Sequence, residues 1–173
     1  MSVALRPTEL RDLAAITAIY GHHVRTGLAS FETEAPDEAE MRGRFEAIRA
    51  QGFPYLTAEI DGRVVGYAYA SLYRTRPAYR FALEDSLYVH PDFTGQGIGR
   101  QLLTQLVAQC EGVGCRQLIA VIGDSGNAAS IGIHAALGFE MVGTFRAIGW
   151  KHERWVDTVL MQRAIGVGDT MAP

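Results

Sequence analysis

The sequence predicts an α+β fold, with a mixed and mostly antiparallel sheet of about seven strands flanked by about four helices. Three observations indicate this class. Apolar residues change between helical and strand spacing along almost the whole chain. Asp61-Gly62 joins two strand-like runs, as in a tight hairpin. Residues 117–122 are almost wholly apolar, which is typical of a strand buried on both faces.

In the first half of the chain, a helix from Asp12 to about His22 is indicated by apolar residues three and four positions apart. A second helix begins at Asp37, whose carboxylate can cap the first turn together with Glu40. It ends at Gly52. The strands of this half are expected at residues 3–6, 55–60, 64–72 and 83–89.

In the second half, helices are expected at residues 97–109 and 127–137, each with apolar residues along one side. The apolar strand 117–122 lies between them in sequence. Residues 139–163 are predicted to form two strands joined near Gly149, because a glycine supports a tight turn.

Length and composition limit the class of protein. The chain has 173 residues, of which 48% are hydrophobic and 20% are charged. This composition is that of a globular domain and argues against disorder. At roughly 100–200 residues per domain, the length fits one domain. We expect residues 1–165 to form it and the Gly-rich residues 166–173 to form a flexible tail.

Charge and cysteine usage argue against several kinds of partner. The 16 basic and 19 acidic residues give a net charge of −3, whereas nucleic-acid-binding proteins usually carry a basic surface. No apolar run reaches the ~18 residues of a membrane span, and the first residues lack a signal-peptide pattern. Cys110 and Cys115 have no second Cys/His pair at zinc-site spacing. We therefore expect a cytoplasmic protein without a nucleic acid, membrane or metal partner.

The segment after the strand at 83–89 carries the most information. It contains Gly95, Gln96, Gly97, Ile98, Gly99 and Arg100 in succession. Glycines let backbone N–H groups approach a ligand closely, and the helix start that follows adds unpaired donors and a positive dipole end. This chemistry suits a phosphate or pyrophosphate, although a plain tight turn could use the same residues.

The spacing in this loop differs from two common phosphate motifs. A P-loop needs Gly-Lys-Ser/Thr, but Arg100 follows Gly99. A dinucleotide fingerprint needs a third glycine where Arg100 stands, and Asp124 after the next strand keeps that motif only as a weak alternative.

The loop instead resembles the acetyl-coenzyme A loop of the GNAT superfamily of N-acetyltransferases, whose pattern is Gln/Arg-x-x-Gly-x-Gly/Ala. Gly97 and Gly99 match its glycines, whereas Thr94 replaces the usual Gln or Arg. The helix at 127–137, which opens with Asn and precedes Gly-Phe, resembles the second signature of the superfamily. His134 stands where many members have Tyr.

A closer resemblance, to the phosphinothricin and methionine sulfoximine N-acetyltransferases, extends over nearly the whole chain. It is carried by residues 30–34, 73–79, 84–86 and 149–157. It implies a GNAT-like sheet, direct transfer of an acetyl group from acetyl-CoA to the α-amine of an amino-acid-like substrate, and often a homodimer. The cofactor contacts that we predict are Leu87, Tyr88, Val89, the loop from Gly95 to Arg100, Asn127 and Ser130.

Candidate catalytic residues lie on the strand before the loop and on the last helix. Glu84, Ser86 and Tyr88 share one strand face, and Glu84 could take a proton from an amine directly or through water. His134 lies about two helical turns after Asn127, so both can address one ligand, and its imidazole could protonate a leaving thiolate. The alternatives are a surface or salt-bridged Glu84 and a His134 that is packed in the core or partly exposed. Asn127 could instead cap its helix, and capping and ligand contact can hold at once.

The candidate acceptor site is a loop with Arg74, Arg76 and Arg80. Arginine holds carboxylates and similar oxyanions with paired hydrogen bonds, so we predict Arg74 and Arg80 as substrate contacts. Phe31 and Tyr79 could form walls of the pocket. A solvated basic loop and core aromatics are the alternatives.

These observations together predict an acetyl-CoA-dependent N-acetyltransferase with Glu84 as the base and His134 as the candidate acid. A noncatalytic acyl-CoA-sensing module is an alternative of another class, and a peptide or polyamine is an alternative acceptor. Glu84 and the arginine loop favour the enzyme, because a sensor needs no base.

Overall fold

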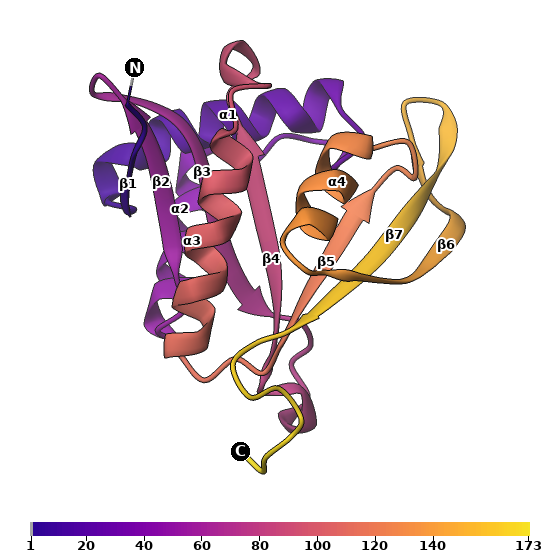
Figure 1. Cartoon of the computed structure of the whole chain (residues 1–173). Coiled ribbons are helices and arrows are strands. Elements are labelled where there is room, and N and C mark those ends of the chain that lie inside the picture. Colours follow the sequence, from indigo (N-terminus) through magenta and orange to yellow (C-terminus); the bar gives the residue numbers. More distant parts are fainter. Residues whose placement is uncertain (1) are drawn as a thin grey trace.

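The computed structural model of the protein describes residues 2–173 (Figure 1). Its strands are β1 (Ala4–Pro7), β2 (Tyr55–Ile60), β3 (Arg63–Leu72), β4 (Ala82–Val89), β5 (Gln117–Gly123), β6 (Glu140–Lys151) and β7 (Arg154–Ala164). Its α-helices are α1 (Leu13–Thr26), α2 (Glu38–Ala50), α3 (Ile98–Gly112) and α4 (Ala128–Ala136). The predicted fold class is confirmed. No helix within residues 2–173 has both the length and the apolar content that a membrane span requires.

The strands form one sheet in the order β1-β2-β3-β4-β5-β7-β6. Among the described strands, β4 and β5 make the one parallel pair, and the other neighbours are antiparallel. The β4–β5 pairing runs from Ala82 opposite Gln117 to Asp85 opposite Ala120. Beyond that point the strands diverge (Figure 1). The sheet is therefore V-shaped, and we call the last pair, Asp85 and Ala120, the apex.

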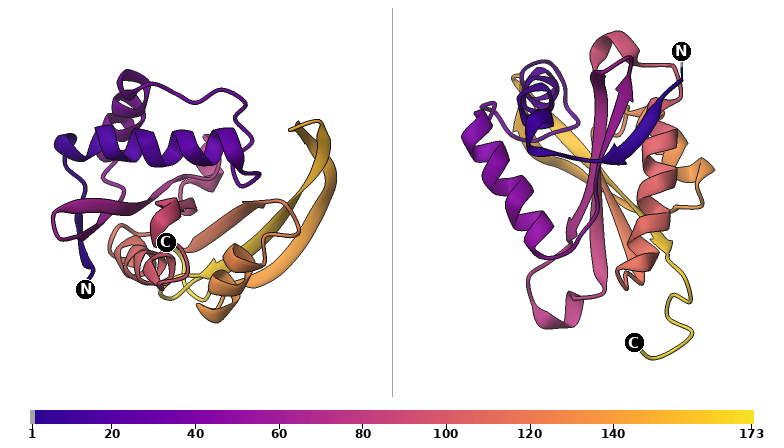
Figure 2. Two further views of the ribbon diagram at one scale, coloured as in Figure 1. Left: turned by 90° about the horizontal axis from the view of Figure 1, so that it is seen from above. Right: turned by 90° about the vertical axis from the view of Figure 1, so that its left-hand side faces the viewer.

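Helices cover both faces of the sheet (Figure 2). On one face, α1 and α2 bury apolar stripes that include Leu13, Ile16 and Met41. On the other face, α3 buries Leu102 and Leu106, so the stripe predicted for this helix is confirmed. The two cores hold β4 from both sides, which fixes the strand on which the predicted site depends.

The helix boundaries follow the predicted signals with two extensions, of which one takes α3 to Gly112, beyond its expected end near Gln109. The Asp37 carboxylate accepts a hydrogen bond from the backbone N–H of Glu40 at 2.8 Å, as a capping residue does. The first helix continues to Thr26, beyond its expected end near His22. Its last turn carries His23, whose ring nitrogen Nε2 lies 2.8 Å from the carbonyl oxygen of Val89, so contact with β4 supports the extra turn.

The prediction of a turn near Gly149 is wrong. The chain turns at His152 and Glu153, which both adopt left-handed backbone conformations, with φ of 48° and 57°. Gly149 lies inside the ladder, opposite Val156. A Cβ atom at Gly149 would lie 2.4 Å from the ring of Phe31, so this glycine permits close packing rather than a turn.

The C-terminal residues 166–173 form turns after β7. The guanidinium of Arg116 donates to the carbonyl oxygen of Gly168 at 3.3 Å. The division into a domain of residues 1–165 and a flexible tail of residues 166–173 stays a prediction.

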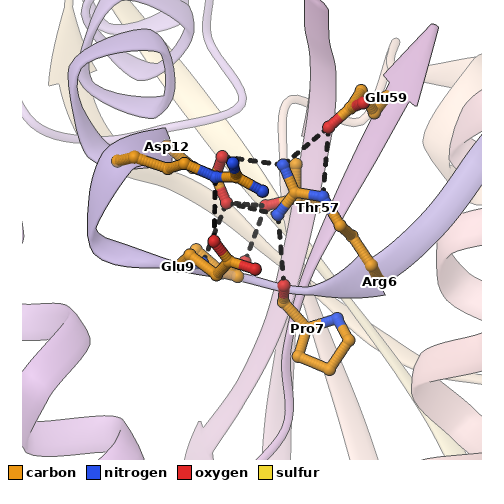
Figure 3. Close-up of polar contacts among 8 residues, drawn as sticks. Arg6, Pro7, Glu9, Asp12, Thr57 and Glu59 are labelled. Atoms are coloured by element: carbon orange, nitrogen blue, oxygen red, sulfur yellow. Dashed lines mark hydrogen bonds and ion pairs between the residues drawn. The ribbon is translucent and has the colours of Figure 1, made fainter. Parts of the chain in front are cut away.

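A partly buried ion network fastens β1 to the start of α1 (Figure 3). The Arg6 guanidinium donates to both carboxylate oxygens of Asp12, at 2.7 and 2.8 Å, and to Glu59 at 2.7 and 3.0 Å. The backbone N–H of Glu9 donates to Asp12 at 2.8 Å. Burial acts to raise the pKa of Asp12, but these hydrogen bonds outweigh it and the pKa is lowered.

Replacing Asp12 by Ala should lower the free energy of unfolding by about 1.5–3 kcal/mol, because the Arg6 guanidinium loses its charged acceptor. Denaturant unfolding measures the loss. The matched control is Arg42→Ala, which removes an exposed pair with Glu38 at 3.5 Å and should cost less than about 0.5 kcal/mol. Equal losses in the two variants would contradict the importance of this network.

Candidate active site

A cleft of about 730 Å³ opens where β4 and β5 diverge. It is bounded by these two strands, the glycine-rich loop, the first turns of α3 and α4, and the chain after α1. Most of the predicted cofactor contacts line it: Leu87, Tyr88, Val89, Gly95, Gly97, Ile98, Gly99, Arg100, Asn127 and Ser130. Gln96 does not line it, because its side chain is exposed between the two glycines, and its role stays a prediction.

The backbone of the loop explains its glycines. Gly95 and Gly97 have φ of 74° and 78°, in the left-handed region that favours glycine. A Cβ atom at either position would meet nothing within 4 Å, so conformation rather than crowding requires them. Gly97 precedes α3, whose first turn presents N–H groups without helical partners and the positive end of a dipole. These features fit a pyrophosphate. The Thr94 hydroxyl is used within the turn, since it donates to Pro91 at 3.2 Å.

Side chains on β4 alternate between the two cores, as predicted. Tyr88 packs edge-on against Tyr20 of α1, with ring centroids 5.0 Å apart. Leu83 is buried in the core under α3, and Leu87 packs against that core. Glu84 therefore faces the α1 side and Asp85 faces the α3 side.

Glu84 is half-buried one residue before the apex and lies opposite Ser71 of β3. Burial raises the pKa of its carboxyl to about 7, with a further increase from the charge of Asp85 and a decrease from Arg74. A group with this pKa can accept a proton near neutral pH. Glu84 does not line the cleft itself, because it lies in the part of β4 that is still paired with β5.

His134 is 2% exposed, and both ring nitrogens have partners. Nδ1 lies 2.7 Å from the carbonyl oxygen of Ser130, and Nε2 lies 3.0 Å from Oδ2 of Asp85. The ring also packs edge-on against Phe139 at 4.9 Å. Burial lowers the pKa of His134, whereas the hydrogen bond and the charge of Asp85 raise it. The two effects of Asp85 together are larger, so the pKa is raised. This geometry favours the packing alternative, and the acid role stays a prediction.

Asn127 caps α4, since its side-chain oxygen accepts the backbone N–H of Ser130 at 3.1 Å. Both residues also line the cleft. The capping alternative is therefore confirmed, and it leaves the amide nitrogen of Asn127 free to meet a ligand.

The predicted acceptor residues are not gathered in the cleft. Arg74 stacks on Tyr73 at 4.2 Å, and Arg80 stacks on Phe81 at 4.4 Å. Tyr79 is 43% exposed on the same loop, whereas Phe31 is 40% exposed on the opposite side of the apex, against β6. Of these, Arg74 is tied most directly to the predicted chemistry, because its charge acts on Glu84. The predicted acceptor residues thus lie on an open surface in the single chain.

A segment that includes the predicted wall residue Phe31 closes the top of the V, a role that the sequence did not indicate. Residues 27–32, which we call the strap, cross from α1 towards β6. Lys151 is 3% exposed and donates to the carbonyl oxygen of Ser30 at 2.6 Å. Tyr20 lies 2.9 Å from the Ser30 hydroxyl. A Cβ atom at Gly123 would lie 2.2 Å from the carbonyl oxygen of Leu28, so only glycine fits beneath the strap.

Asp85 was also missed as a site residue. The alternation along β4 places it among Leu83, Leu87 and Val89, and a carboxylate within an apolar row is the signal that could have identified it. Its partner on α4 is distant in sequence, so only the fold shows the pair.

The fold and the cleft define the class of protein. Residues 16–139 match the model of the acetyltransferase (GNAT) family. The chain belongs to this family, and the prediction of an acetyl-CoA-dependent N-acetyltransferase is confirmed.

Individual relatives show which members of this family the chain resembles. The chain is 60% identical to a phosphinothricin N-acetyltransferase of Alcaligenes faecalis over 162 residues, covering 94% of this chain and 82% of that protein. It is 39% identical to an L-methionine sulfoximine/L-methionine sulfone acetyltransferase of Pseudomonas paraeruginosa, covering 94% of each. A crystal structure of a phosphinothricin acetyltransferase from Sinorhizobium meliloti in complex with AcCoA has a TM-score of 0.97 and 48% identity, covering 100% of this chain and 94% of that one.

Proposed function

We propose that this protein transfers the acetyl group of acetyl-CoA to the α-amine of a small amino-acid-like substrate such as phosphinothricin or methionine sulfoximine. The names of the Alcaligenes and Pseudomonas relatives support both acceptors. The observation that carries the proposal is the half-buried Glu84, whose pKa of about 7 suits a base, next to the apex of a cleft that fits acetyl-CoA.

The donor side uses the cleft. The N–H groups of the loop from Gly95 to Arg100 hold the pyrophosphate, together with the dipole of α3. Past the apex, β4 has no β5 partner, so the backbone N–H groups of Leu87 and Val89 can hold the pantetheine arm and polarise the thioester carbonyl.

The acceptor side supplies a base and cations. An α-amine is mostly protonated at pH 7, since its ordinary pKa is about 7.7–8.0. Glu84 takes the proton directly or through water. The nitrogen then attacks the thioester carbon, and the carbon–sulfur bond breaks with its electron pair on sulfur. The sulfur receives the second proton that the nitrogen releases, so coenzyme A leaves as a thiol. Arg74 and Arg80 bind the carboxylate of the substrate, with Phe31 and Tyr79 beside it.

Replacing Glu84 by Gln should lower kcat by about 10²-fold near pH 7, because the base is lost. Since Glu84 accepts protons only above its pKa of about 7, kcat/KM of the wild type should rise steeply between pH 6 and 8. The variant should follow the amine alone, so the loss should shrink at higher pH. A loss below about fivefold at pH 7, in a folded variant, would remove Glu84 from the mechanism.

The main test of the function compares acceptors. Phosphinothricin should be acetylated with a kcat/KM roughly ten to a hundred times that of its carboxamide, because a hydrogen bond to a charged group contributes about 1.5–3 kcal/mol. Arg74→Ala and Arg80→Ala should remove most of this preference. Arg76→Ala on the same loop is the control and should keep it. If a peptide amine or the amide reacts as well as the free acid, the acceptor assignment fails.

We also propose that the protein acts as a homodimer through the β6–β7 hairpin. Six large apolar side chains of the hairpin are 52–62% exposed: Met141, Val142, Phe145, Ile148, Trp150 and Trp155. The outer strand β6 is an open sheet edge, and the end of the hairpin extends past α4 in Figures 1 and 2. Contiguous apolar surface of this kind marks an interface. Because Phe31 packs on Gly149 of β6, a second copy bound there would also close the acceptor surface.

Trp155→Glu should convert the dimer to a monomer in light scattering and raise KM for the acceptor amine. The control is Val113→Glu at the end of α3, which is 42% exposed and far from the hairpin in sequence, and it should stay dimeric. A wild type that is monomeric at micromolar concentration would contradict the proposal.

A further inference from the structure

We propose that Asp85 is a positioning residue of the acetyl transfer: it keeps His134 as a cation at the apex, and its second oxygen holds a water that faces the departing sulfur. This inference rests on the proposed function for the direction in which acetyl-CoA lies. It concerns a residue outside the predicted catalytic set, and it gives His134 a role other than proton donor.

The first step is to count the protons on the two ring nitrogens of His134. The carbonyl oxygen of Ser130 only accepts hydrogen bonds, so Nδ1 of His134 carries a proton. An ionised Asp85 carboxylate also only accepts, so with Asp85 in that state Nε2 carries a second one. An imidazole with protons on both nitrogens is a cation. Asp85 and His134 are each 3% exposed at their side chains, so the charges neutralise each other inside the protein.

The second step is the unused oxygen. Oδ1 of Asp85 is buried and accepts no hydrogen bond from any group in residues 2–173. A buried carboxylate oxygen left without a donor costs about 1–3 kcal/mol or more. A small chamber of about 60 Å³, lined by Asp85, Ser86, Asn127 and His134 among others, adjoins it. This space is enough for a water with several polar partners.

The third step is the position of the chamber. It shares Leu87, Gly123 and Asn127 with the large cleft, so it is the inner end of that cleft. The loop from Gly95 to Gly99 lies along the cleft away from the apex, since none of its residues lines the chamber. Acetyl-CoA with its pyrophosphate on that loop therefore points its thioester towards the apex.

The chemistry of the pair is electrostatic. When the nitrogen–carbon bond forms and the carbon–sulfur bond breaks, the electron pair of the latter goes to sulfur. Glu84 takes one proton from the ammonium before the attack, and the second proton, released from nitrogen as the amide forms, goes to the thiolate, so that coenzyme A leaves as a thiol. A water fixed by Asp85 and polarised by the nearby cation donates a hydrogen bond to that sulfur, and the pair gives up no proton. Fixed donors aimed at developing charge are among the stronger contributions to catalysis.

Few other titratable groups act on the pair. Glu84, the neighbour of Asp85 on β4, and Cys110 on α3 both respond to the Asp85 charge. The adjoining part of β5 contributes Ala120 and Ile122 to the chamber. The charge state of His134 is therefore set mainly by Asp85, and removing the carboxylate charge should make the imidazole neutral.

The first measurement is ¹⁵N NMR of the ligand-free protein at pH 7.5, where a histidine with the ordinary pKa of about 6.5 is roughly nine-tenths neutral. The protein has five histidines, and His134→Gln identifies the signal of interest. Wild-type His134 should show two protonated nitrogens, and Asp85→Asn should show one. A neutral His134 in the wild type would overturn the proposal, whatever the variants do.

The second measurement is kinetic and uses any acceptor amine that the wild type acetylates. Asp85→Asn should lower kcat about tenfold or more, with KM for acetyl-CoA within about threefold, because the loss falls on the departing sulfur. Asp12→Asn, in the ion network of Figure 3, is a matched buried control and should leave kcat unchanged. A folded Asp85→Asn variant with kcat within twofold of wild type would also overturn the proposal. If the wild type acetylates other amines but not phosphinothricin, the acceptor assignment is wrong, and the test of Asp85 still applies with those amines.

Discussion

The parallel pairing of β4 and β5 ends at Asp85 and Ala120, and the rest of the site depends on that limit. Paired strands satisfy each other's backbone groups, whereas strands that diverge must leave those groups to a ligand, a side chain or water. Here the divergence opens a cleft between two arms of the sheet, and the core under α3 contains residues of both arms. The start of α3, the cap of α4 and the Asp85–His134 pair all lie along this opening. The end of the β4–β5 pairing therefore determines where these groups lie.

The strap joins the two sides of the opening between β4 and β5. Residues 27–32 are joined to α1 through Tyr20 and to the hairpin through Lys151, whose ammonium lies in the interior. Close approach is possible because Gly123 and Gly149 present no side chain to the strap. The ion network of Arg6, at the far edge of the sheet, does the same for the N-terminal strand. Polar groups therefore fasten the margins of the fold, while apolar layers fill its two cores.

Much of the fold could be predicted from the sequence because local signals agreed with the global arrangement. Apolar spacing located the helices and strands, and the glycine-rich loop located the cleft. The β6–β7 turn was misplaced, because His152 and Glu153 adopt left-handed conformations without glycine, while Gly149 serves packing against Phe31. The apex pair could not be derived, because Asp85 and His134 meet only through the packing of α4 on the sheet. The acceptor residues stay dispersed in one chain, which local sequence signals cannot reveal.

The unpaired stretch of β4 past the apex also bears on how the protein unfolds. Backbone hydrogen bonds between neighbouring strands make a sheet unfold cooperatively. In this sheet, the ends of β4 and β5 have no such bonds between them. The two arms are joined there by the strap, the Asp85–His134 pair and the shared core under α3 rather than by a continuous ladder. A ligand that fills the gap adds contacts between the two arms and so stabilises the folded chain. The lifetime of the folded chain is thereby linked to the supply of its acetyl donor.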